Sequence, residues 1–177
     1  MATKISLFQL TLSTPLGDMV ATADRTALHV LEFVDNPKPF VLNNKSIIVP
    51  GFSPIFDVLK KELDAYFTGT LKQFTVPLHL EGTPFQQQTW QKLCMINYGT
   101  TISYAQLAQS IRKPTAHRAV ANANGANRIA IIIPCHRVIT SAGTLGGYRQ
   151  KLERKQWLLE HERARKVLPY MTTRDLQ

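Results

Sequence analysis

The sequence predicts an α+β protein in which a small N-terminal α/β domain, residues 1–82, precedes a mainly helical C-terminal domain, residues 83–177. Residues 4–34 alternate between apolar and polar side chains, as strands do, whereas apolar residues recur at helical spacing from residue 83 onward. The charge changes at nearly the same place. Residues 1–83 hold 7 Lys and Arg against 8 Asp and Glu, and residues 84–177 hold 14 against 4.

Composition excludes several classes of protein. With 177 residues and 44% hydrophobic content, the chain can form one or two domains with a real core. No leader pattern opens it and no apolar run approaches the roughly 18 residues of a membrane helix, so we expect an intracellular, cytoplasmic protein without a membrane partner. Cys94 and Cys135 lack the spacing of a disulfide framework or a metal site, so we expect free thiols and no metal. The basic half indicates a polyanionic partner, although a basic surface with no partner remains an alternative.

The elements of the first domain follow in order. Strands are predicted over residues 4–13, 19–23 and 27–34, with turns at residues 15–18 and 23–25. Residues 35–50 are rich in Pro and Asn and are expected to form a loop. Ser53 and Pro54 then begin a helix that ends before Gly69, and its apolar stripe consists of Ile55, Leu59, Leu63 and Phe67. We find no group of chemically reactive side chains in this domain.

The second domain begins with three predicted helices. Thr83 and Pro84 start the first, in which Phe85, Thr89, Leu93 and Ile96 share a face and Cys94 beside them is expected to be a small core residue. Ser103 and Gln106 form a capping-box pattern before a second short helix. After a turn at Lys113-Pro114, Thr115 is expected to cap a third helix that ends at Gly125. The last two helices form a helix-turn-helix candidate.

The helix after Thr115 is unusually thin. Five of its residues are Ala or Val, and Arg118 is its only permanent charge. Such a helix can approach a DNA groove closely, and its arginine can enter the space that a displaced base leaves. From these residues alone, a tightly packed core helix with Arg118 at its rim is equally consistent.

Residues 132–138, IIPCHRV, place a cysteine and a histidine in a turn after an apolar run. A last helix is predicted over residues 151–165, where Glu162 shares an apolar face with Leu152 and Leu159. A buried carboxylate needs a partner, and a histidine is a suitable one. We therefore predict that Cys135, His136 and Glu162 form a relay that activates the thiol, with a water between thiol and imidazole.

Five blocks, SYAQLA, RAVANANGAN, IPCHRV, GTLGGY and KQWLLEHE, occur in the order and spacing of the O6-alkylguanine-DNA alkyltransferases. The chain closely resembles that family over residues 83–168 and more loosely in the N-terminal domain. The resemblance implies a ribonuclease-like N-terminal domain. It also implies a C-terminal DNA-binding domain that carries the helix-turn-helix and the active-site cysteine.

The resemblance also implies a suicide repair reaction. Cys135 would take the alkyl group from O6-alkylguanine, with O4-alkylthymine as a second candidate lesion, in one irreversible turnover without a cofactor. The partner would be double-stranded DNA containing O6-alkylguanine, bound in the minor groove by a monomer that flips the damaged base. The matching catalytic positions are Cys135, His136, Glu162, Tyr104 as donor to the guanine ring and Asn127 as brace of the turn. The matching substrate and DNA positions are Thr115, Arg118, Ala119, Ala123, Val138, Tyr148 and Arg149. Among them, Arg118 would replace the flipped nucleotide, the backbone of Val138 would read the base, and Tyr148 would line the pocket.

Some positions depart from the family pattern. Arg149, Gln150 and Lys151 stand where small residues and glycines are usual, and Ala121 and Arg128 replace a glycine and a proline. We expect these changes to alter the pocket wall and the range of lesions. Two other function classes are alternatives. A binding-only relative would have tryptophan at Cys135, and a cysteine hydrolase would need an oxyanion hole and would turn over.

Overall fold

The computed structural model describes residues 4–163, which form two compact units. The first unit ends at Glu81 but also takes in Arg128–Ile132; the second comprises Gly82–Asn127 and resumes at Ile133. A short segment from the second half of the sequence therefore belongs to the first unit. The division expected from the sequence, between residues 82 and 83, does not include such an exchange. No helix in the described part of the chain is long and apolar enough to cross a membrane.

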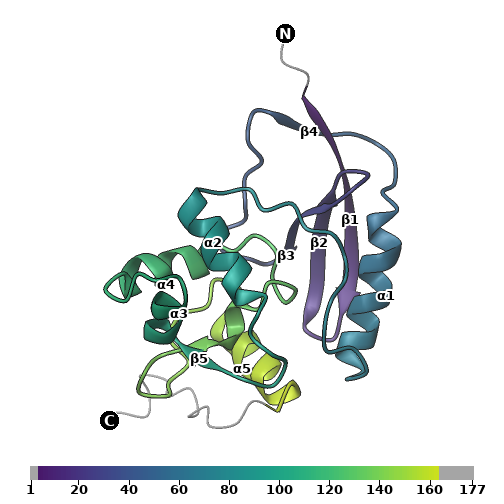
Figure 1. Ribbon diagram of the computed structural model, residues 1–177. Helices are drawn as coiled ribbons and strands as arrows, with labels where there is room; N and C mark the ends of the chain where they lie inside the picture. Colours follow the sequence, from purple (N-terminus) through teal and green to yellow (C-terminus); the bar gives the residue numbers. More distant parts are fainter. Residues whose placement is uncertain (1–3, 164–177) are drawn as a thin grey trace. The chain divides into compact units, whose positions relative to one another are not determined.

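The first unit is built on a four-stranded sheet in the order β3-β2-β1-β4 (Figure 1). The three strands predicted from alternating patterns are present as β1 (Ile5–Thr14), β2 (Gly17–Ala23) and β3 (Leu28–Phe33), and they are antiparallel neighbours in the sheet. Pro15 and Leu16 connect the first two strands, and Gly17 follows with a φ of 115°, which a glycine adopts without strain. The loop expected over residues 35–50 contains a further strand, β4 (Ser46–Ile48), which pairs in parallel with β1.

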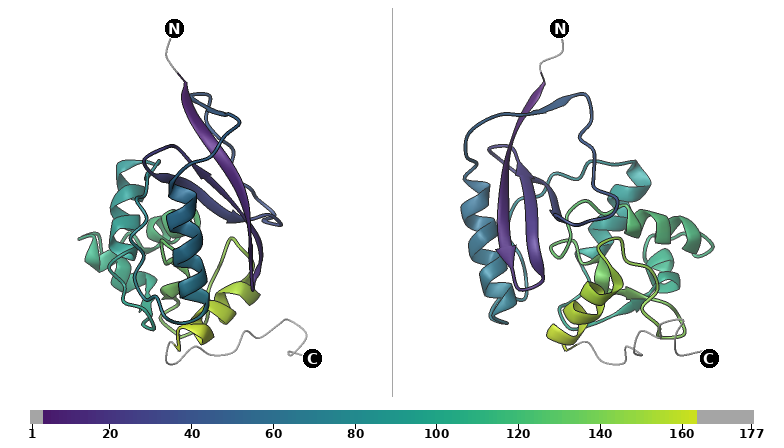
Figure 2. Two further views of the ribbon diagram at one scale, coloured as in Figure 1. Left: turned by 90° about the vertical axis from the view of Figure 1, so that its right-hand side faces the viewer. Right: turned by 180° about the vertical axis from the view of Figure 1, so that it is seen from behind.

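Helix α1 (Ile55–Phe67) lies alongside the sheet (Figures 1 and 2). The helix begins one residue later than predicted, with Pro54 instead of Ser53 at the N-cap and without a side-chain cap. The Ser53 hydroxyl still accepts a hydrogen bond from the Ile55 backbone nitrogen at 3.2 Å. Ile55, Leu59 and Leu63 are buried as predicted. The stripe ends with the fully buried Tyr66, whereas Phe67 is only partly buried.

The segment Arg128–Ile132 joins the first unit along β3. Leu31 and Ile129 form a parallel bridge in which the Leu31 nitrogen donates to the Arg128 carbonyl and the Ala130 nitrogen donates to the Leu31 carbonyl. The Ile132 nitrogen then donates back to the Ala130 carbonyl, and Ile131 between them has a φ of 71°. This tight three-residue turn is strained for a β-branched side chain, and from it the chain returns to the second unit.

Three helices open the second unit: α2 (Pro84–Leu93), α3 (Tyr104–Ser110) and α4 (His117–Gly125). Both predicted N-terminal caps are present, because Thr83 with Gln86 and Ser103 with Gln106 form complete capping boxes. Helices α3 and α4 form the predicted helix-turn-helix. The expectation that Thr115 caps α4 is wrong, since the helix begins after Ala116 without a side-chain cap.

The remaining elements bring distant parts of the chain together. Strand β5 (Ile102–Ser103) pairs in parallel with β6 (Val138–Ile139), which directly follows the 3-10 turn η1 (Cys135–Arg137). Helix α5 (Leu152–His161) ends with Glu162 as its C-terminal cap, and Arg163 follows with a φ of 55°. The helix therefore ends before the predicted Arg165, which itself lies outside the described chain. Cys94 is exposed at the end of α2, so the expectation that it is a core residue is wrong.

Candidate active site

The pairing of β5 with β6 places Cys135 beside the start of α3. Cys135 is the first residue of η1 and is 6% exposed. Asn127, just after the end of α4, donates from Nδ2 to the Cys135 sulfur at 3.1 Å and to the Ile133 carbonyl at 2.8 Å. Asn124 donates to the carbonyl of Cys135 itself at 3.3 Å. The nucleophile and its backbone are therefore held by the end of the helix-turn-helix.

His136 and Glu162 are fully buried and hydrogen bonded, with 2.7 Å between the imidazole Nε2 and the carboxylate Oε1. A carboxylate only accepts, so Nε2 must carry a proton, and in the neutral ring Nδ1 is then the free acceptor. Nδ1 is buried without a hydrogen-bond partner. The structure thus brings two of the three predicted relay residues into contact, and it leaves on His136 the atom that could take a proton from the thiol through a water.

Arg137 is a second partner of the Glu162 carboxylate, and the sequence did not predict it. Its Nε donates to Glu162 Oε2 at 2.8 Å, its Nη2 donates to Oε1 at 3.0 Å, and its Nη1 donates to the Ile96 carbonyl at 2.6 Å. The Gly99 nitrogen adds a bond of 3.3 Å to Oε2. The sequence does contain a signal for this pair, because an arginine directly follows the histidine. A guanidinium can donate two parallel hydrogen bonds to a buried carboxylate, which makes arginine its best partner.

These contacts set the charges of the relay. Burial alone would raise the pKa of Glu162, but His136 and Arg137 hold it well below its usual range. Burial lowers the pKa of His136, against the opposing effect of Glu162, and burial raises the pKa of the Cys135 thiol, which the Asn127 hydrogen bond only partly offsets. The resting site consequently holds an ionised carboxylate, a neutral imidazole and a thiol.

Lys155 on α5 was also missed by the sequence reading. Its side chain is completely buried, and its ammonium donates to the carbonyls of Val138 at 2.7 Å and Gly147 at 3.1 Å. Burial lowers its pKa to about 8. Lys155 thereby ties the strand after the nucleophile to the loop that carries Tyr148. No local pattern distinguishes it from a lysine on the solvent side of a helix.

Two tyrosines lie near the cysteine. Burial raises the pKa of Tyr104, the first residue of α3, and of Tyr148, and in both cases the charge of a Cys135 thiolate would add to the shift. The Tyr148 hydroxyl is buried without a hydrogen-bond partner. A Cβ at Gly146 would come within 3.2 Å of the Tyr104 ring and hydroxyl, so a glycine is needed for this close approach.

The predicted DNA-binding residues are spread over different environments. Arg118, Ala119 and Thr115 are exposed at the start of α4, as a contact with DNA requires. Ala123 is buried, and its carbonyl accepts a bond from the Trp90 indole at 2.8 Å; its place among the DNA-binding positions stays a prediction.

The loop before α5 contains the remaining predicted positions. Val138 is buried, with its carbonyl bonded to Lys155. Arg149 is half-buried, Gln150 is buried, and Lys151 is exposed with a φ of 75°. These three long side chains stand where the family usually has small residues, and among them Lys151 is the one that turns toward solvent.

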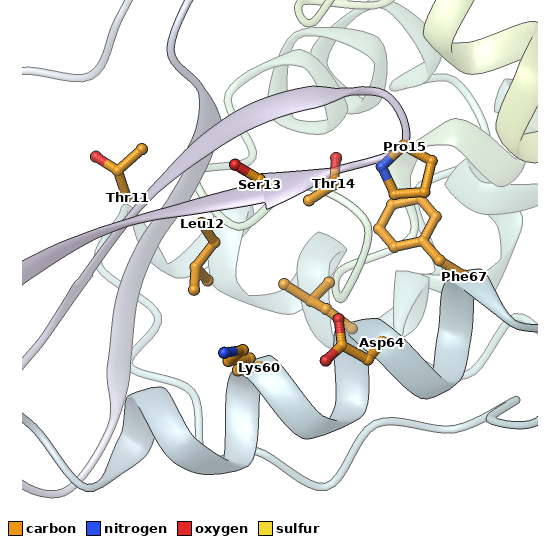
Figure 3. A pocket seen from close by; sticks show the side chains of 9 residues that line it. Thr11, Leu12, Ser13, Thr14, Pro15, Lys60, Asp64 and Phe67 are labelled. Carbon is orange, nitrogen blue, oxygen red and sulfur yellow. The ribbon is translucent and has the colours of Figure 1, made fainter.

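A separate pocket lies between β1 and α1 in the first unit (Figure 3). Its volume is about 230 Å³, and residues such as Thr11, Lys60 and Phe67 line it. All of its lining residues belong to the first unit, so it contributes nothing to the cysteine site. Among residues 4–163, no group of three or more His, Cys, Asp or Glu side chains could hold a metal ion.

The fold and the site together define a two-unit α+β protein whose helical unit carries a buried cysteine next to a His–Glu pair. Residues 84–164 match the DNA-binding domain of 6-O-methylguanine DNA methyltransferases, and residues 7–80 match their ribonuclease-like domain. The chain belongs to this family.

Individual relatives agree with this assignment over nearly the whole chain. A methylated-DNA–protein-cysteine methyltransferase of Methanosarcina barkeri is 42% identical over 151 residues, which cover 85% of this chain and 94% of the relative. One of Mycobacterium leprae is 40% identical and covers 93% and 96%. The crystal structure of Mycobacterium tuberculosis OGT in complex with DNA is similar at a TM-score of 0.78 and 39% identity, and covers 91% of this chain and 94% of that chain. The α+β fold, with a ribonuclease-like domain before a helical DNA-binding domain, is thereby confirmed.

Proposed function

We propose that this protein repairs alkylated DNA by moving the alkyl group of O6-alkylguanine onto Cys135 in a single, irreversible turnover. The observation that carries the proposal is the buried thiol of Cys135 in the turn that also presents His136, whose imidazole is fixed by Glu162 at 2.7 Å. This arrangement can deprotonate a thiol and supplies what one nucleophilic displacement needs. The family to which the chain belongs uses the same class of substrate, as its name states.

The reaction balances with the groups present. The thiol proton passes to Nδ1 of His136 through a water, and Glu162 stabilises the imidazolium. The sulfur then attacks the alkyl carbon, the S–C bond forms and the C–O6 bond breaks. The dealkylated guanine, which stays in the DNA strand, takes up one proton at N1 as it returns to its keto form, and this balances the proton that the thiol gave up to His136. Tyr104 donates a hydrogen bond to the ring. The thioether cannot be hydrolysed readily, so the protein is spent after one lesion.

The charge distribution supports duplex DNA as the partner. Between Glu81 and Glu153 the sequence contains no Asp or Glu, whereas it contains eight Lys and Arg residues: Lys92, Arg112, Lys113, Arg118, Arg128, Arg137, Arg149 and Lys151. Arg128 belongs to the first unit and Arg137 is paired with Glu162, and the remaining cations of this stretch give the second unit an attraction to phosphates. We infer that α4 enters the minor groove and that exposed Arg118 fills the stack behind the flipped base. The protein would act as a monomer, because every group of the site comes from one unit of one chain. We infer the cytoplasm as its place of action.

Mass spectrometry of the intact protein tests the transfer. After incubation with a duplex containing O6-methylguanine, the protein should gain the mass of one methylene, and peptide mapping should place it on Cys135. Cys135→Ser should gain nothing, and Cys94→Ala should react like the unsubstituted protein. Release of free methanol with repeated turnover and an unmodified cysteine would instead identify a hydrolase.

Base flipping is tested with Arg118→Ala. This variant should react much more slowly with the lesion in duplex DNA but almost normally with free O6-benzylguanine, since only the duplex requires extrusion. Arg112→Ala is the matched control, because Arg112 is also an exposed cation of the helix-turn-helix. It should weaken duplex binding in a salt-dependent way without this selective loss. An equal slowing of both substrates in Arg118→Ala would contradict the flipping role.

A further inference from the structure

The carboxylate of Glu162 is shared between two side chains, the imidazole of His136 and the guanidinium of Arg137. Its Oε1 accepts from His136 at 2.7 Å and from Arg137 at 3.0 Å, and its Oε2 accepts a second bond from Arg137 at 2.8 Å. The side chains of His136 and Glu162 have no exposed surface, and that of Arg137 is 7% exposed. In this dry setting the two-pronged ion pair between Arg137 and Glu162 is complete without the histidine. The carboxylate therefore has little net charge left to hold a proton on His136.

The other charged groups around His136 act in the same direction. Lys155 on α5 lies close enough to disfavour an imidazolium, as does Arg137 from the same turn as His136. Cys135 is a thiol at rest, because burial raises its pKa. Near Arg137 and Glu162 stand Tyr98 and Tyr148, in which burial raises the pKa, so both are neutral in the physiological range. Glu162 is thus the one anion that faces the imidazole from the described chain.

We propose that Arg137 is a positioning residue of the alkyl-transfer relay: by sharing the Glu162 carboxylate, its guanidinium keeps His136 neutral at rest and therefore able to accept the proton of the Cys135 thiol. A buried carboxylate that faces the imidazole alone raises the pKa of the ring and so favours the imidazolium, which could take no further proton. Arg137 also fixes the relay in space, because its Nη1 is anchored on the Ile96 carbonyl at 2.6 Å. This role for Arg137 rests on the proposed function, because it concerns the proton acceptor for Cys135. The experiment that tests it measures the protonation of His136 and does not require alkyl transfer.

The test is a titration of His136 by nuclear magnetic resonance on protein with labelled histidines. Cys135→Ser serves as the background, since it removes the thiol whose titration would be coupled to the ring. The His136 signal is identified by its loss in His136→Gln. In the background protein, His136 should be neutral at neutral pH, with a midpoint below its ordinary value of 6.5. Adding Arg137→Gln removes the charge but keeps a hydrogen-bond donor, and should raise the midpoint by about one pH unit or more, a tenfold gain in proton affinity.

Two controls separate charge from general disruption. Arg137→Lys keeps the charge and should leave the midpoint near that of the background. Arg128→Met removes a cation that is paired with Glu81 in the first unit, and should not move it. An unchanged midpoint in folded Arg137→Gln would overturn the proposal. If that variant does not fold, the background protein alone decides: an imidazolium at neutral pH, with Arg137 in place, would overturn it, and a neutral ring would support it.

Discussion

Replacing Lys155 by methionine should change the stability of the protein in a way that depends on pH. The ammonium is completely buried and burial lowers its pKa from 10.5 to about 8. The unfolded chain keeps its proton up to the ordinary value, so between these two pKa values the unfolded state binds more protons than the folded one. Raising the pH through this window therefore favours the folded state.

The size of the effect follows from the shift. At about 1.4 kcal/mol per pKa unit, the change from 10.5 to about 8 corresponds to about 3 kcal/mol of stability gained across the window. Below pH 8 the folded protein carries the cost of burying the charged ammonium, which is the same about 3 kcal/mol. Two hydrogen bonds from the ammonium to the Val138 and Gly147 carbonyls offset this cost and contribute about 1–3 kcal/mol each. A neutral amine still donates both bonds. Lys155→Met should hence cost little at neutral pH and about 3 kcal/mol more at the alkaline end.

Urea denaturation at a series of pH values measures this difference. Cys135→Ser and Cys135→Ser with Lys155→Met form the pair to compare, because the thiolate otherwise stabilises the ammonium. All other alkaline titrations are common to both proteins and cancel. A stability difference that stays constant from neutral pH to pH 10.5 would refute the reasoning, and would mean that the Lys155 ammonium is well solvated.

Three further predictions concern single residues. Gly146→Ala places a Cβ within 3.2 Å of Tyr104 at a φ of 66°, so it should lose about 1 kcal/mol or more and slow alkyl transfer in a single-turnover assay; Gly147→Ala, where a Cβ meets nothing within 4 Å, should do neither. Because the pKa of Glu162 is lowered on folding, its contribution to stability is present above the ordinary value of 4.5 and is lost as the pH falls below it. Acid denaturation should therefore be shallower below that pH in Glu162→Gln, and equal slopes would argue against the buried ion pair. Cys94→Ala should change the free energy of unfolding by less than about 0.5 kcal/mol, since the residue is exposed; a loss of several times that size would show that its side chain is packed.

Local signals in the sequence predicted local structure well. The two capping boxes require only residues three apart, and both are present. The pairing of His136 with Glu162 was also predictable, because a carboxylate on an apolar helical face has to find a partner. In each case the physical requirement is visible in the residues that satisfy it.

The features that were missed depend on contacts between distant segments. Arg137 and Lys155 are side-chain types that usually reach solvent, and only the assembled unit buries them. Thr115 was expected to cap α4 by its residue type, but the helix begins two residues later. Residues 128–132 belong to the first unit because they pair with the edge of β3. An apolar run by itself does not indicate which sheet it will pair with.

The burial of Cys135 has a consequence for the lifetime of the protein before it meets damage. A single-use nucleophile is wasted if peroxide, disulfides or other oxidants reach it first, and such reagents act on exposed thiolates. At 6% exposure Cys135 is shielded from them, while the exposed Cys94 meets them at the surface. Bulk thiol reagents would therefore modify Cys94 first, and the protein's repair capacity would outlast its first oxidation.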